Sequence, residues 1–371
     1  MSSTSIDLKE KCRSWLKDQV FPLWCREGFD QTHGVFVENL SFEGRALQSS
    51  LRSLVQARQI YSFCEGLKMK VVASEVAKPL VVRASHSFVQ RYQSSSGAFY
   101  HSVDSTGQAE NRDHDLYTQA FALFALAYGY EISQDPSFQQ AAHSVETYLR
   151  QERSHSRGGF TEIKGGQVLF QSNPHMHLFE AALVWRRLDP DPTWKRLSDE
   201  IDELCRSRFI NPETGLLAEH FDPEWRPLRK EGRFIFEPGH HFEWSWLFHQ
   251  FQNITRSSRE EVSRSLFDKA EHLGLSRDRK LAIDEVWSDG QPCKLSSRFW
   301  PQTERVKAAV VLKHEESADI ALQALIDQYL LMDQGLWRDT RLEDGSYATI
   351  PVKASSLYHI INAMSEYVAL R

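Results

Sequence analysis

Two ionisable side chains close together in the sequence, His240 and Glu243, are of types that transfer protons. His240 and Glu243 follow Pro238 and Gly239 in the segment 237–248 (EPGHHFEWSWLF). Apolar residues then recur at three- and four-residue spacing, which predicts a helix that begins near His240. In its first turn the two side chains share one face, and the positive end of the helix dipole favours a neutral imidazole. Such a histidine suits general-base catalysis, although a helix cap or a solvated side chain is the plain structural alternative.

Other polar side chains recur at the starts of predicted helices. They are Arg52, Tyr117, Asn173, His177, Glu304 and His359, with Trp300 just ahead of Glu304. If these helix starts meet at one face of the molecule, several titratable groups converge there. Convergence favours a functional pocket over surface capping, because burying such groups without a role is costly.

Histidines that act as a neutral base or a protonated acid suit proton transfer at a carbon next to a carbonyl. That step is common to sugar 2-epimerisation and aldose–ketose isomerisation. In this interpretation Glu243 holds or tunes His240, and the other side chains stack on the sugar or bind its oxygens. The candidates for stacking and oxygen binding are Arg52, Tyr117, His177, Trp244 and Trp300.

Three other classes of protein fit part of the pattern. A glycosidase needs two carboxylates across the scissile bond, and Glu243 with Glu304 could supply them, but the histidines would then have no role. A metal site could use the three histidines and Glu243, yet the chain has no HExxH or comparable spacing. A non-enzymatic helical scaffold would leave the polar set without a purpose. No Walker A loop, Rossmann fingerprint or GxSxG motif is present.

Short glycine-centred segments with strand-like alternation recur about every 55 to 65 residues. They are residues 33–38, 96–101, 158–162, 214–219 and 334–339, with 281–286 as a member that lacks the glycine. Several continue into a turn, so each predicts a small β-hairpin.

Helical periodicity fills the sequence between these loops. One helix is predicted directly after each loop, at 50–64, 114–130, 174–188, 240–251, 302–311 and 355–370. A second precedes the next loop, at 8–24, 71–92, 136–150, 192–209, 259–273 and 316–332. Six helical hairpins predict an all-α fold, an (α/α)6 barrel whose inner ring is formed by the helices after the loops. We expect one catalytic domain over residues 1–371.

The composition narrows the class of protein. Hydrophobic residues make up 41% of the chain, enough for a large core, and the net charge of -6 without a block of like charge argues against nucleic acid or an anionic membrane as a partner. The sequence lacks a run of about eighteen apolar residues and a signal-peptide pattern, so we expect a cytoplasmic protein. Its five scattered cysteines predict neither a disulfide framework nor a zinc site.

The chain resembles the N-acylglucosamine 2-epimerase family, which includes mannose isomerases, sulfoquinovose isomerase, cellobiose 2-epimerases and mannose 2-epimerases. The resemblance covers nearly the whole chain. It is carried by LR at 51–52 with VQARQIY at 55–61, DLY at 115–117 with QAF at 119–121, NPHMH at 173–177 with EA at 180–181, PGH at 238–240 with EW at 243–244, WPQTE at 300–304, and YH at 358–359.

The resemblance implies an (α/α)6 barrel in which His240 and His359 are the catalytic acid/base pair. It assigns sugar binding and orientation to Arg52, Asn173, His177 and Glu243 and implies neither a metal nor a redox cofactor. Together with Tyr117, Trp300 and Glu304, these four residues make up the predicted substrate-binding set.

The substrate is indicated by the residues around His240. Cellobiose epimerases typically have GHDIE followed by a small residue, whereas this chain has GHHFEW at 239–244, which disfavours a disaccharide. The EWSW pattern resembles the mannose isomerase branch. We therefore predict interconversion of free D-mannose and D-fructose through a cis-enediol(ate), by a monomer or a homodimer. The alternative is 2-epimerisation, of mannose and glucose or of N-acylglucosamine and N-acylmannosamine, if both histidines address C2.

Overall fold

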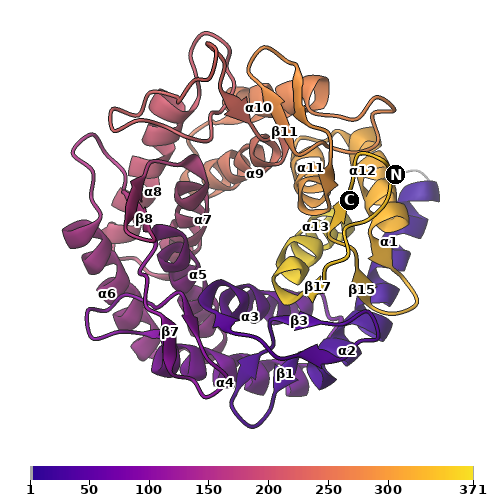
Figure 1. The fold of residues 1–371 in the computed structure, drawn as a ribbon. Helices are drawn as coiled ribbons and strands as arrows, with labels where there is room; N and C mark the ends of the chain where they lie inside the picture. Colours follow the sequence, from indigo (N-terminus) through magenta and orange to yellow (C-terminus); the bar gives the residue numbers. More distant parts are fainter. Residues whose placement is uncertain (1–2, 371) are drawn as a thin grey trace.

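The computed structural model describes residues 3–370, which form two concentric rings of helices (Figure 1). The inner ring consists of α3 (Ser53–Lys68), α5 (Leu116–Ser133), α7 (Ser172–Leu188), α9 (Pro238–Thr255), α11 (Trp300–Val311) and α13 (Leu357–Ala369). Each inner helix packs against the next, and α13 closes the ring on α3. This is the predicted (α/α)6 barrel, and its inner helices are the ones that follow the glycine-centred loops.

The outer ring supports the inner one from outside (Figure 1). It consists of α1 (Ser3–Trp15), α2 (Phe21–Arg26), α4 (Ser74–Tyr92), α6 (Pro136–Glu152), α8 (Pro192–Leu204), α10 (Glu260–Leu273) and α12 (Glu315–Gln328). The single helix predicted at 8–24 is divided, because a π-helical stretch, Leu16–Val20, separates α1 from α2. Pro22, which has no N–H to donate, lies in the first turn of α2. A second π-helical stretch, Cys205–Phe209, continues α8.

The two rings differ in how their helices are buried. The inner helix α5 buries a continuous apolar run from Phe121 to Tyr128, as expected for a helix that is covered on all sides. The outer helix α8 instead buries one stripe at three- and four-residue spacing, which includes Trp194, Leu197 and Ile201. Trp194 stacks on Trp185 of α7 with ring centroids 5.1 Å apart, so the core lies between the rings. None of the helices described here has the length and apolar character needed to cross a membrane.

Short antiparallel strands form the loops at one face of the barrel (Figure 1). They are β1 (Phe29–Asp30), β2 (Val35–Phe36), β3 (Asn39–Leu40), β4 (Ala46–Leu47), β5 (Leu51–Arg52), β6 (Ser102–Val103), β7 (Ala109–Asn111), β8 (Glu162–Lys164), β9 (Gln167–Leu169), β10 (Ile235–Phe236), β11 (Glu285–Trp287), β12 (Pro292–Lys294), β13 (Ser297–Arg298), β14 (Leu330–Leu331), β15 (Leu336–Trp337), β16 (Thr340–Arg341) and β17 (Val352–Lys353). Several pairs join different repeats. For example, β17 pairs with β3 in the register that places Val352 opposite Leu40, which ties the last loop to the first.

A side chain of the following inner helix clamps the backbone of most of these loops. In the second repeat, Gln119 Oε1 accepts a hydrogen bond from Phe99 N (2.7 Å) and Gln119 Nε2 donates to Phe99 O (2.9 Å). The equivalent pairs are Gln56 with Phe36, His175 with Phe160, His241 with Leu217, and Gln302 with Ala282. The clamps hold each loop against the inner ring.

Two residues after each clamped position, a polar side chain faces the start of an inner helix. Glu38 contacts Arg52, His101 contacts Asp115, and Glu162 accepts hydrogen bonds from the backbone N–H groups of Leu116 and Tyr117. Glu219 contacts His240, and Asp284 contacts Arg298. The repeat thus delivers a polar group from a clamped loop to the place where the inner helices begin.

Candidate active site

The first turns of the inner helices enclose a cavity of about 160 Å³ on the side of the strand loops. Every inner helix contributes to its wall, and two residues come from the loops just before α9 and α11. The lining residues are Arg58, Tyr117, Asn173, His177, Glu237, His240, Glu243, Arg298, Trp300 and His359. Helix starts that are far apart in the sequence therefore meet at one face, as the repeat predicted.

His240 is held by the loop carboxylate of the fourth repeat. Its Nδ1 lies 2.8 Å from Oε2 of Glu219, whose carboxylate also accepts hydrogen bonds from Ser172 Oγ and Glu237 N. Burial alone would lower the pKa of His240, but the negative charges of Glu219 and Glu237 outweigh it and raise the pKa to about 9. His240 is therefore an imidazolium near neutral pH.

The sequence predicted a neutral imidazole at His240, because this residue lies at the start of α9. The structure reverses this expectation, because a full negative charge at hydrogen-bond distance outweighs the partial positive charge of a helix end. Burial raises the pKa of Glu219, but the charge of His240 more than compensates and holds that pKa below its ordinary value. Since an ionised carboxylate can only accept, Nδ1 donates to Glu219 and leaves Nε2 as the nitrogen available to a substrate.

His359 also has a carboxylate partner, but its surroundings are different. Its Nδ1 lies 2.9 Å from Oε1 of Glu304, and Oε2 of Glu304 lies 2.6 Å from Nζ of the fully buried Lys307. Burial outweighs the hydrogen bond that His359 donates to Glu304 and, together with the positive charges of Arg58 and Lys307, lowers the pKa of His359 to about 3. His359 is therefore a neutral imidazole whose Nε2 can accept a proton.

Trp300 lies close to both histidines. Its ring centroid is 5.1 Å from that of His240 and 5.8 Å from that of His359. One protonated and one neutral imidazole thus flank a single flat apolar surface. Neighbouring titratable groups whose pKa values are driven apart are the usual arrangement of an acid and a base in one active site.

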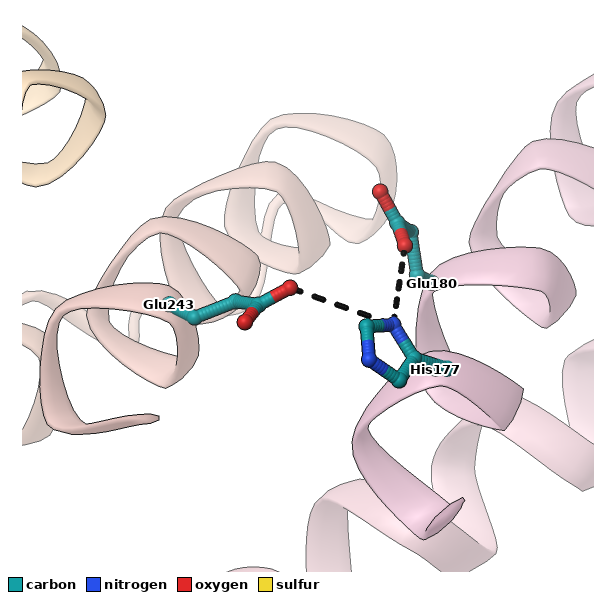
Figure 2. Close-up of side chains that lie close together, drawn as sticks. All are labelled: His177, Glu180 and Glu243. Atoms are coloured by element: carbon teal, nitrogen blue, oxygen red, sulfur yellow. Dashed lines mark ion pairs between the residues drawn. The ribbon is translucent and has the colours of Figure 1, made fainter. Parts of the chain in front are cut away.

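Two lining residues of the cavity, His177 and Glu243, form a buried group with Glu180, which lies behind them (Figure 2). Nδ1 of His177 lies 3.5 Å from Oε2 of Glu180 on the same helix and 3.9 Å from Oε1 of Glu243, which reaches across from α9. Burial, reinforced by the negative charge of Glu304, raises the pKa of Glu243 well above its ordinary value. Burial therefore favours the protonated form of the Glu243 carboxyl group, which can donate a hydrogen bond into the cavity.

Two sets of side chains in this region have ligand atoms close enough together for a metal ion. They are His177, Glu180 and Glu243, and Glu219, Glu237 and His240. Each set already faces a cation. The positive charge of Lys307 interacts with Glu180 and Glu243, and the second set contains the imidazolium of His240. A divalent ion would be repelled by these charges, so the donors suit hydrogen bonds to hydroxyl groups better than metal binding.

The opposite wall is fixed by a buried arginine. Arg58 Nη2 donates to the hydroxyl of Tyr117 (3.0 Å), and the guanidinium lies 4.5 Å from the ring centroid of Phe121. The ring of Tyr117 in turn contacts His177 edge to face at 5.0 Å. Asn173 Oδ1 is buried without a hydrogen-bond partner among residues 3–370, so it remains available to a bound molecule.

Most of the predicted site residues line the cavity. They are the two predicted catalytic residues, His240 and His359, together with Tyr117, Asn173, His177, Glu243 and Trp300. The other two predicted substrate-binding residues lie elsewhere. Arg52 is at the rim, ion-paired to Glu38. Glu304 is fully buried behind His359. Direct substrate binding by either one stays a prediction, and in this structure Glu304 orients His359.

Sequence reasoning missed several residues. Arg58, Glu237 and Arg298 line the cavity, and Glu219 and Lys307 lie directly behind the histidines. A signal for Glu219 was available, because it ends the fourth glycine-centred loop at the position that Glu38 and Glu162 occupy in their repeats. Comparing the repeats position by position would have identified it.

Known proteins resemble this chain in sequence and in fold. A model of the N-acylglucosamine 2-epimerase (GlcNAc 2-epimerase) family matches residues 34–363. A protein of Rhizobium meliloti (strain 1021) named mannose-6-phosphate isomerase is 33% identical over 368 residues, which cover 95% of this chain and 94% of that protein. The structure of cellobiose 2-epimerase from Bacillus thermoamylovorans B4167 has a TM-score of 0.86 at 16% identity, covering 98% of this chain and 99% of that one. A D-mannose isomerase structure has a TM-score of 0.84 at 18% identity, and the match covers 99% of this chain and 97% of that one.

Proposed function

The chain belongs to the N-acylglucosamine 2-epimerase family and is therefore an enzyme of the isomerase class, and from this premise we propose that it interconverts D-mannose and D-fructose. The observation that carries the proposal is the pair of histidines whose pKa values are shifted in opposite directions and which both lie close to Trp300. The names of the Rhizobium relative and of the D-mannose isomerase structure support mannose as the aldose.

The two histidines fit the proton transfers of this reaction. Nε2 of neutral His359 removes the proton from C2 of open-chain mannose, while His240 donates a proton to the carbonyl oxygen at C1, which gives a cis-enediol. Protonated His359 then delivers a proton to C1, and the hydroxyl at C2 returns its proton to His240 as the C2 carbonyl forms. Both histidines end in their starting states, and fructose is released.

The remaining cavity residues hold the sugar. The protonated carboxyl group of Glu243 and the hydroxyl of Tyr117 donate to sugar oxygens, and Oδ1 of Asn173 accepts from a hydroxyl. Trp300 offers its ring to the apolar face of the sugar. These contacts orient C1 and C2 between the histidines, and orientation of this kind is a large part of catalysis.

We assign the free hexose, rather than its 6-phosphate, as the substrate. Arg298, which lines the cavity, is already bound to Glu237 (2.7 Å) and to Asp284 (2.9 Å). Arg52 at the rim is bound to Glu38. A phosphate group would have to compete with these carboxylates for each guanidinium, and it would approach the negative charge of Glu237.

A second candidate is 2-epimerisation, in which both histidines address C2 from opposite faces. The observation in its favour is that His240 and His359 flank the same indole ring, so a sugar stacked there presents its C2 to both. A glycosidase reaction fits less well. Glu304, the second carboxylate that it would need, is buried between His359 and Lys307.

The test is to incubate the protein in heavy water with D-mannose and, separately, with D-mannose 6-phosphate, and to follow products and deuterium by NMR. We expect D-fructose from mannose, with deuterium at C1 where the transferred proton exchanges with solvent. Glucose labelled at C2 with little fructose would establish the epimerase instead. If the protein converts D-mannose 6-phosphate but not D-mannose, the assignment of the free hexose as the substrate is wrong. The variants His240→Asn and His359→Asn serve as controls and are expected to be folded but inactive.

A further inference from the structure

A second cavity, of about 170 Å³, lies at the opposite end of the inner helices. Its walls come from α3, α5, α7, α9 and α13. On four of these helices a lining residue follows a residue of the catalytic cavity by three positions: Tyr61 follows Arg58, Glu180 follows His177, Trp246 follows Glu243, and Asn362 follows His359. About one helical turn, roughly 5 Å, therefore separates the two cavities. We refer to the second one as the far cavity.

Aromatic rings form much of the apolar wall of the far cavity. They are Tyr61, Phe124, Tyr128 and Trp246. Tyr61 contacts Tyr128 edge to face with centroids 4.9 Å apart, and Tyr61 also packs on Phe124 at 5.2 Å, so the rings are fixed by one another. Rigid aromatic surfaces are favourable for binding because little conformational entropy is lost when a ligand packs on them.

The far cavity presents carboxylate acceptors and one buried donor that lacks a partner, and the two cations of its wall, Lys68 and Arg187, are ion-paired to Glu131. Glu366 accepts hydrogen bonds from Trp246 Nε1 (2.8 Å) and Gln250 Nε2 (3.3 Å), both through Oε1. Glu65 and Glu180 add two more carboxylates to the wall. Asn362 is buried, and no residue in the described range 3–370 accepts a hydrogen bond from its Nδ2. The site thus offers carboxylate acceptors beside an amide donor.

This combination selects for a class of ligand. An ammonium ion could donate to the carboxylates but could not accept from Asn362, and an anion would have to compete with Glu131, to which both cations of the wall, Lys68 and Arg187, are already ion-paired. A hydroxyl group both donates and accepts, so several hydroxyls on one carbon skeleton satisfy both kinds of group. The far cavity is also close in volume to the catalytic cavity, about 170 Å³ against about 160 Å³.

We propose that the far cavity is a second binding site, which takes an uncharged polyol or monosaccharide and is separate from the catalytic cavity. The ligand packs on the ring of Trp246, accepts a hydrogen bond from Asn362 and donates to Glu366. The inference does not depend on the reaction assigned to the histidines.

One tryptophan in each cavity makes the proposal measurable. Trp246 lines the far cavity and Trp300 the catalytic one. The whole chain is labelled with 5-fluorotryptophan, and the two ¹⁹F resonances are assigned with Trp246→Phe and Trp300→Phe. D-Mannitol is the probe, because it has hydroxyls but no carbonyl and cannot be isomerised. We expect a saturable shift of the Trp246 resonance during titration. Its absence at concentrations that would saturate a site with a dissociation constant of about 10 mM would overturn the proposal.

Variants at Asn362 test the donor. Asn362→Leu removes the amide and is expected to weaken the Trp246 shift at least tenfold. If the leucine variant fails to fold, the near-isosteric Asn362→Asp is used instead, because it also lacks the amide N–H donor. Asn253→Leu, at an exposed position on α9, is the matched control and is expected to bind as the wild type does. An undiminished shift in both Asn362 variants would overturn the assignment. Mannose turnover, measured on the same samples, shows separately whether the proposed reaction fails.

Discussion

At the scale of single residues, the catalytic cavity contains two histidines that each pair with a glutamate but whose pKa values shift in opposite directions. His240 and His359 both place Nδ1 on a carboxylate, yet the pKa of the first is raised to about 9 and that of the second is lowered to about 3. The difference arises from the charged residues near each histidine–glutamate pair. Glu237 adds a second negative charge near His240, whereas Arg58 and Lys307 place positive charge near His359. The fold therefore prepares an acid and a base from the same side chain.

The first prediction concerns Glu219. In Glu219→Gln the pKa of His240 falls, because a negative charge beside the imidazolium is removed. A raised pKa keeps His240 protonated up to about pH 9, so the alkaline limb of kcat/KM is expected to move to lower pH in the variant. The measurement is a pH–rate profile between about pH 5 and pH 10. Glu213→Gln, on an exposed loop, is the control, and an unmoved limb in Glu219→Gln would show that His240 is not the titrating acid.

The second prediction concerns Lys307, which is fully buried and ion-paired to Glu304 at 2.6 Å. Lys307→Met leaves a buried carboxylate without its cation, so the free energy of unfolding is expected to fall by about 3 to 5 kcal/mol. The double variant Lys307→Met/Glu304→Gln removes both charges and is expected to regain part of that loss. Urea denaturation of the three proteins measures both effects. A double variant less stable than Lys307→Met would contradict the account.

The sequence predicts side chains that point into the cavity better than those that stand behind them. His240, His359 and Trp300 stood out because their types and places at helix starts already suggested chemistry. Lys307 lies in the run ERVKAA, where a lysine resembles any exposed helical residue. It is buried because α11 lies between α9 and α13 in the inner ring, and that arrangement of neighbours is a tertiary property.

At the scale of elements, the repeated clamp explains how short strands hold a precise site. Each clamp satisfies a backbone group that would otherwise be buried without a partner. In the fourth repeat the clamp is His241, whose Nε2 accepts from Leu217 N at 3.1 Å, two residues before Glu219. The position of the carboxylate that charges His240 therefore depends on a hydrogen bond to a different histidine.

The third prediction tests one clamp. Gln119→Leu leaves both the N–H and the C=O of Phe99 without their partner, and each buried unsatisfied group costs roughly 1 to 3 kcal/mol. We expect the unfolding free energy to fall by about 2 to 5 kcal/mol. Thermal and urea unfolding measure the change, with Gln140→Leu on the exposed side of α6 as the matched control. Equal stability of the two variants would mean that the clamp contributes little.

Helix positions could be read from the sequence because apolar residues recur with the period of a helix. The predicted helix 136–150, for example, is α6 (Pro136–Glu152). The π-helical stretches, Leu16–Val20 and Cys205–Phe209, could not be read in this way. Each inserts extra backbone within an otherwise helical pattern, and side-chain periodicity does not reveal such a small change of pitch.

At the scale of the whole molecule, the barrel is closed by contacts between the two ends of the described chain. Helix α1 packs against both α12 and α13. Asp319 of α12 joins the three helices, since it accepts hydrogen bonds from the hydroxyls of Ser5 and Tyr367. Near this seam, Trp24 of α2 stacks on Trp337 of β15 with centroids 5.2 Å apart. None of the residues named at this seam lines the catalytic cavity.

The fourth prediction follows from the position of this seam. Asp319→Ala removes the carboxylate that accepts hydrogen bonds from Ser5 and Tyr367, so we expect the unfolding free energy to fall by about 1 to 3 kcal/mol. The value of kcat is expected to stay unchanged, because Asp319 lies far from the histidines in the ring. Asp327→Ala, at an exposed position on the same helix, is the control. A large fall in kcat at full occupancy by substrate would show that the seam is coupled to the active site.

The place of α13 in the ring sets the time at which a newly made molecule becomes active. It fills the last position, between α11 and α3, and it carries His359. A ribosome that adds about 5 to 20 residues per second takes roughly 15 to 60 seconds to pass from the end of α3 to α13. Late in that interval the nascent chain already holds His240 and Glu219, but α3 has no neighbour on one side and His359, the proposed proton acceptor, has not yet been synthesised. Completion of the barrel and the onset of catalysis are therefore one event.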